Sequence, residues 1–119
     1  NYDDLTLESL RSNAALSPAA KRILGEIAAL RRQIAESETA MKSLQQQIND
    51  ANQDVERLRR NLASLNGVAG QQERVQKYAS DLAAMDARIV TLRDQSAAET
   101  RKRDDLRRQL NAKIEAATF

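Results

Sequence analysis

Two heptad series of apolar residues run along the chain, and they mirror each other about a segment that contains two glycines. When positions are paired so that their numbers sum to 140, Leu58 faces Leu82 and Ala51 faces Ile89. Alternating steps of three and four residues keep apolar side chains on one side of a helix. The sequence therefore predicts two long helices that pack antiparallel as a coiled-coil hairpin. The first series is Ala20, Ile23, Ile27, Leu30, Ile34, Ser37, Met41, Leu44, Ile48, Ala51, Val55, Leu58, Leu62 and Leu65, and the second is Val75, Tyr78, Leu82, Met85, Ile89, Leu92, Ser96, Glu99, Arg103, Leu106 and Leu110, continued by Lys113 or Ile114.

Local signals set the predicted limits of the two helices. Ser17 and Pro18 are typical of a helix start, because the Ser hydroxyl accepts from free amides and Pro loses nothing at the first position. A glycine can adopt the left-handed conformation that ends a helix. We therefore expect helices over about 18–66 and about 71–117, joined by a turn at 66–70.

The chain ahead of Ser17 differs from the rest. Residues 1–16 are expected to form a lead-in with a short helix around 7–13, and residues 17–119 the hairpin. Each long helix of the hairpin would extend about 70 Å at about 1.5 Å per residue. We interpret the sequence as a segment of a larger protein.

Composition agrees with an all-α fold and narrows the classes of function. Strong helix formers dominate, whereas aromatic residues make up only 3% of the chain. The sequence has no Cys and no His, so the common zinc ligands are missing, and no apolar run approaches the roughly 20 residues of a membrane span. We expect no metal, no cofactor, no small-molecule substrate and no transmembrane helix.

Both heptad series weaken at the same place. The pairing puts Ser37 opposite Arg103, and Glu99 lies four residues before Arg103 on the same helix. Glu99 and Arg103 can pair beside Ser37 and form a polar layer between the helices. We interpret this layer as one that fixes the register or is merely tolerated.

The predicted turn is a candidate interaction tip. It consists of Asn66, Gly67, Val68, Ala69 and Gly70, and it should expose Val68. The segment lacks the glycine spacing and the Lys-Ser/Thr of a phosphate-binding loop.

Basic residues near the turn raise the alternative of an RNA-binding arm. Acidic residues are interleaved with them, and Glu56 with Arg60 and Glu73 with Lys77 have favourable helical spacing. With 19 basic and 17 acidic residues the net charge is only +2, which argues against a nucleic-acid partner. The carboxylates lie on polar helical faces beside Arg or Lys, and no nucleophile has a recognisable base. We therefore predict that the chain is not an enzyme.

Small apolar residues outside the heptad stripe favour a protein partner. With Leu24 and Val90 they would form a flank along which a second hairpin or an upstream domain of the same chain could pack. The alternative is an ordinary solvent-exposed alanine-rich face. The alanines are Ala28, Ala35, Ala83, Ala84, Ala87, Ala97 and Ala98.

Three short segments also support a family resemblance. These are residues 16–19 ahead of the long helix, residues 56–62 before the turn, and Tyr78 with Leu82 after it. They resemble the C-terminal helical hairpin of mucoidy inhibitor A-like bacterial proteins of unknown function, although Asp86 stands where Glu is expected. The resemblance implies a spacer or scaffold role in the periplasm or cell envelope, and it supplies no catalytic residues.

Our functional expectation is a structural, protein-interaction hairpin within a larger bacterial protein. One alternative is a transport or secretion adaptor that binds a channel through residues 66–70. The other is the RNA-binding arm.

Overall fold

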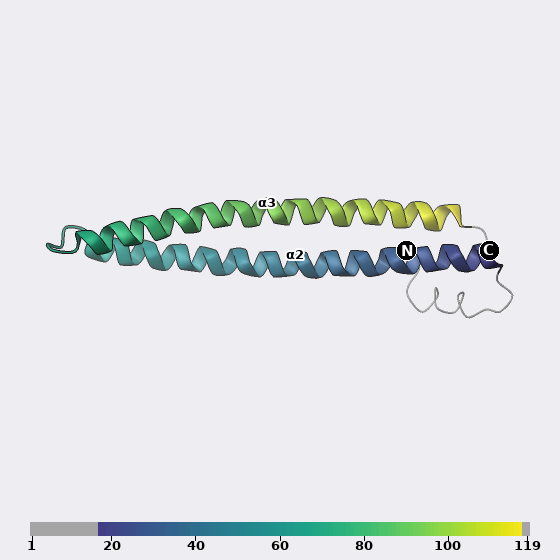
Figure 1. Ribbon diagram of the computed structural model, residues 1–119, viewed down its shortest axis with the longest axis horizontal. Helices are drawn as coiled ribbons and strands as arrows, with labels where there is room; N and C mark the ends of the chain where they lie inside the picture. Colours follow the sequence, from purple (N-terminus) through teal and green to yellow (C-terminus); the bar gives the residue numbers. More distant parts are fainter. Residues whose placement is uncertain (1–16, 118–119) are drawn as a thin grey trace. The chain divides into compact units, whose positions relative to one another are not determined.

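A computed structural model describes residues 17–117, which are almost entirely helical. Helix α2 spans Pro18–Leu65, helix α3 spans Gln72–Ala116, and a turn joins them (Figure 1). Residues 17–117 contain no strand. The predicted all-α helical hairpin is confirmed. The short helix predicted around 7–13 lies outside the described residues.

Helix α2 begins at the predicted cap. The backbone N–H of Ala20 donates to the Ser17 hydroxyl at 3.1 Å, and the N–H of Lys21 donates to the Ser17 carbonyl at 3.0 Å. Pro18 occupies the first helical position, where its missing N–H costs nothing. The first turn of α2 is therefore stabilised by its own sequence.

The turn between the helices depends on two glycines in the left-handed region. Gly67 and Gly70 both have φ of 77°, and the N–H of Val68 donates to the Leu65 carbonyl at 3.1 Å. Helix α3 then begins, and the N–H of Val75 donates to the carbonyl of Gln71 at 3.0 Å. The left-handed residues let the backbone leave α2 and enter α3 within a few residues.

Replacing Gly67 with Ala is expected to destabilise the hairpin by about 1–2 kcal/mol, the cost of a left-handed L-residue. A Cβ at Gly67 would meet no atom within 4 Å, so backbone strain alone sets the effect. Gly25→Ala is the matched control. It lies inside α2, a Cβ there also has open space, and it should stabilise by about 0.5–1 kcal/mol. Urea unfolding measures both changes, and equal signs would contradict the assignment of the turn.

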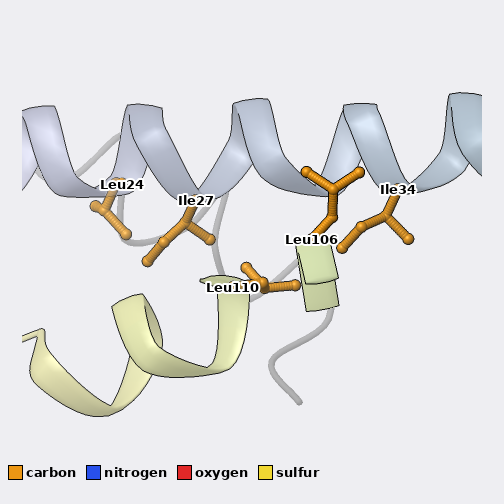
Figure 2. Close-up of a cluster of buried hydrophobic side chains, with 5 residues drawn as sticks. All are labelled: Leu24, Ile27, Ile34, Leu106 and Leu110. Atoms are coloured by element: carbon orange, nitrogen blue, oxygen red, sulfur yellow. The ribbon is translucent and has the colours of Figure 1, made fainter. Parts of the chain in front are cut away.

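The chain divides into two compact units. The first contains the described residues 17–40, which include the start of α2, and 99–117, which include the end of α3. Its core is a cluster of buried side chains contributed by both helices, with Ile23, Leu30 and Ile114 packed against it. The close-up in Figure 2 shows the side chains of α2 directed toward those of α3. The buried members are Leu24, Ile27, Ile34, Leu106 and Leu110.

The position of Leu24 corrects the sequence analysis. It was expected outside the apolar stripe, yet its exposed fraction is 1% and it belongs to the core cluster. Leu24 lies four residues after Ala20 and three before Ile27, so all three share one face of α2. Both flanking residues are also buried. The apolar stripe is therefore wider here than two positions per heptad.

The second unit comprises residues Met41–Ala98 and includes the turn. Its core again combines residues from α2 and α3, with Leu44, Leu82 and Met85 packed against it. Two pairs expected from the mirror pattern, Ala51 with Ile89 and Ile48 with Leu92, have both members in this cluster. The buried members are Ile48, Ala51, Val55, Ile89 and Leu92.

Candidate functional site

The predicted polar layer lies within the first unit and contains a buried Ser37. Its exposed fraction is 2%, and its hydroxyl donates to the main-chain carbonyl of Glu99 at 3.2 Å. A side chain as short as Ser reaches the backbone of another helix only where the two helices approach closely. Ser37 is therefore a point of close contact between α2 and α3.

Arg103 has other partners than expected. The sequence suggested pairing with Glu99, but the guanidinium lies 3.0 Å from Asp104 and 3.9 Å from Glu38 on the other helix. Arg107 also donates to Glu38, at 3.0 Å. A pair four residues apart on one helix contributes only about 0.2–0.5 kcal/mol, so a carboxylate across the interface competes readily. Glu38, which the sequence analysis did not single out, is thus the common partner of two arginines.

Ser37→Ala is expected to cost about 1 kcal/mol, because it removes one hydrogen bond between the helices. Ser37→Leu should cost more, about 1–3 kcal/mol, because the closely approaching helices leave no room for three further carbon atoms. This reverses the expectation from the heptad pattern alone, under which a Leu at position 37 completes the apolar stripe. Urea unfolding of both variants tests the order; a Leu variant more stable than wild type would contradict the close approach.

A second link between the helices joins Glu26 of α2 to Lys113 of α3. The ammonium of Lys113 donates to the Glu26 carboxylate. This hydrogen bond, together with the attraction of the Lys113 charge, lowers the pKa of Glu26 below its ordinary value of 4.5. The contact holds the first turns of α2 beside the last turns of α3, and the sequence analysis did not identify it.

Acid should remove the contribution of this contact. A carboxylate whose pKa is lower in the folded state stabilises the fold above its unfolded pKa, and this contribution is lost as the pH falls through the folded value. We expect Glu26→Gln to lower the melting temperature slightly at pH 7 and to have no effect well below pH 4.5. Thermal unfolding of both proteins across this range tests the sign. A larger difference at low pH would contradict the pairing.

The candidate tip is exposed throughout. Residues 66–70 all lie at the surface, and the exposed fraction of Val68 is 48%. The two glycine conformations shape the turn, which leaves one large apolar side chain, Val68, exposed to solvent. The tip could contact an apolar surface, but it presents no array of polar groups.

Three of the basic residues near the turn lie beside carboxylates. Arg57 lies 3.2 Å from Asp54, Arg59 3.5 Å from Glu56, and Lys77 3.2 Å from Asp81. These partners differ from the predicted pairs of Glu56 with Arg60 and Glu73 with Lys77. An exposed basic side chain can pair with a carboxylate three or four residues away on the same helix, so the sequence spacing alone does not identify its partner.

The basic stretch at 101–108 is also partly neutralised. Arg107 pairs with Glu38, and Arg108 lies 3.5 Å from Asp105. The stretch therefore contributes contacts within the hairpin as well as surface charge.

The flank of small residues has no cover within the second unit. Ala83, Ala84, Ala87, Ala97 and Ala98 are exposed, and Val90 has an exposed fraction of 60%. These residues follow α3 on the side away from Ile89 and Leu92, which are buried.

Comparisons with known proteins add no further constraint on the function of the chain. Comparisons with family models, with curated proteins and with solved structures found no match. Neither α2 nor α3 is long and apolar enough to cross a membrane. Among residues 17–117, no three acidic side chains gather as a metal site.

Proposed function

We propose that the chain is a structural, protein-interaction helical hairpin that acts as a spacer or scaffold segment of a larger bacterial protein. The observation that carries this proposal is the first unit, in which the start of α2 and the end of α3 are held together. Leu110 of α3 packs in the same cluster as Ile27 of α2, and Lys113 binds Glu26. A segment whose two ends meet can be attached to a parent domain and present the helices between them.

The use of the side chains supports a structural role. Large apolar residues fill the two cores, and many charged residues pair on exposed faces. We infer that the chain is not an enzyme, because the carboxylates that form ion pairs within residues 17–117 are each held by Arg or Lys. The resemblance to mucoidy inhibitor A-like proteins motivates the bacterial and cell-envelope parts of the proposal.

An adaptor that binds through its tip is the second candidate. The exposed Val68 on a turn shaped by two glycines favours it. We rank an RNA-binding arm below both, since Arg57 and Arg59 each lie beside a carboxylate.

The spacer and adaptor roles differ in their response to hairpin length. Deleting residues 58–64 and 76–82 together removes one heptad from each helix, keeps the paired register and leaves the first unit and the turn in place. In the full-length protein, a spacer should lose complementation of the gene deletion on shortening and keep it after Val68→Ser. Loss with Val68→Ser and retention on shortening would overturn the spacer role in favour of the tip adaptor. Circular dichroism checks that the shortened chain is still helical.

A further inference from the structure

The turn between the helices contains an asparagine that is directly followed by a glycine. Asn66 and Gly67 are both exposed and lie just after the last residue of α2. Gly67 has a φ of 77° and Asn66 has no positive φ, a combination typical of a type II turn, which the N–H of Val68 closes by donating to the Leu65 carbonyl. Asparagine is a chemically labile residue, and a following glycine lacks the Cβ that would hinder attack of its nitrogen on the asparagine side chain.

The two groups that would react are both accessible. Within residues 17–117, neither the Asn66 carboxamide nor the N–H of Gly67 takes part in a hydrogen bond. Apart from its chain neighbours, no atom lies within 4 Å of the place where a Cβ on Gly67 would stand. The side chain of Asn66 therefore has open space in which to turn toward the backbone of Gly67.

The other asparagines among residues 17–117 lie inside helices. In a helix the amide of the following residue donates to a carbonyl of the preceding turn, and the main-chain dihedral angles are fixed. That amide nitrogen cannot reach the side chain of the residue before it. The carboxamide of Asn49 also accepts from Gln45 at 3.1 Å. These helical asparagines are Asn49, Asn52, Asn61 and Asn111, and none of them precedes a glycine.

We propose that Asn66 is a site of spontaneous deamidation through a cyclic imide with Gly67. The Gly67 nitrogen attacks Cγ of Asn66, and the new bond replaces the bond between Cγ and Nδ2. Nδ2 leaves as ammonia with the proton that the Gly67 nitrogen loses. Water then opens the ring: breaking the new bond gives aspartate, and breaking the original peptide bond gives isoaspartate. Water is the only other reactant.

The modification changes the tip in two ways. It adds a negative charge just after α2, where the last carbonyls of the helix already carry partial negative charge, so the turn becomes less stable. Isoaspartate also lengthens the main chain inside the turn that the N–H of Val68 closes. A partner that binds the apolar side chain of Val68 would bind the modified protein more weakly.

Mass spectrometry of the whole chain after incubation at neutral pH tests this inference. Trypsin cleaves after Arg60 and Arg74 and releases residues 61–74, which contain Asn66 together with Asn61 as an internal control. We expect the mass gain of an amide-to-acid conversion at position 66, at least about tenfold faster than at position 61, with both aspartate and isoaspartate formed. Asn66→Gln should abolish the gain, because its longer side chain would have to close a larger ring. Circular dichroism checks that this variant is still helical.

A synthetic peptide of residues 61–74 gives the reactivity of the same sequence without the paired helices. If this peptide reacts while the folded chain does not, the turn holds the pair unreactive and the inference is wrong. Equal rates at positions 61 and 66 would also overturn it, and aspartate without isoaspartate would exclude the cyclic imide. The heptad deletion leaves residues 66 and 67 in place, so the spacer role is tested separately.

Discussion

Replacing Ile27 with Ala is expected to lower the free energy of unfolding by about 2–4 kcal/mol. Ile27 has an exposed fraction of 1% and lies in the core of the first unit, where the side chains of α2 and α3 meet (Figure 2). Truncation removes three carbon atoms from the buried core and leaves a cavity, which the two helices can fill only partly by shifting toward each other. Urea unfolding followed by circular dichroism measures the loss.

Val68→Ala is the control for this substitution. Val68 is 48% exposed on the turn, so its truncation should change the stability by less than about 0.5 kcal/mol. An Ile27 variant that unfolds at the same urea concentration as this control would mean that Ile27 is not in the core.

Leu92→Ala should have the largest effect in the second unit, about 2–4 kcal/mol, and should exceed Leu82→Ala. Leu92 has an exposed fraction of 4% and is part of the buried cluster, whereas Leu82 is half-buried and packs against that cluster. The heptad pattern gives the two leucines equal weight, so their order is a test of the three-dimensional packing. Urea unfolding of both variants under one set of conditions decides the order; equal losses would contradict it.

Features determined by a few neighbouring residues were predictable from the sequence. The start of α2 depends on Ser17 and Pro18, and the turn depends on the positive φ of Gly67 and Gly70. The antiparallel pairing followed from a periodic pattern, which reports a property shared by many residues and tolerates single exceptions. These signals are local or repeated, and both kinds can be recognised in a single sequence.

Features that depend on distance between the helices were not predictable. Whether Leu24 is buried depends on how much of the surface of α2 is covered by α3. The spacing of residues along α2 alone does not determine this width. The pairing of Arg103 and Arg107 with Glu38 likewise depends on the distance between the two helices at that point. Ser37 was predicted to belong to a polar layer between the helices, but its hydrogen bond to the Glu99 carbonyl requires a close approach of the two backbones, which the heptad pattern does not give.

The absence of Cys from the sequence makes the central claim, that α2 and α3 fold back on each other, directly measurable. Gln45→Cys and Gln95→Cys place spin labels at two exposed positions of the second unit, and pulsed electron spin resonance measures their separation. Packed helices have axes about 8–10 Å apart, so with label linkers we expect a separation below about 30 Å. Dilution with unlabelled protein should leave this distance unchanged, because it lies within one chain. A separation near 75 Å, the length of about 50 residues of continuous helix at about 1.5 Å each, would contradict the hairpin.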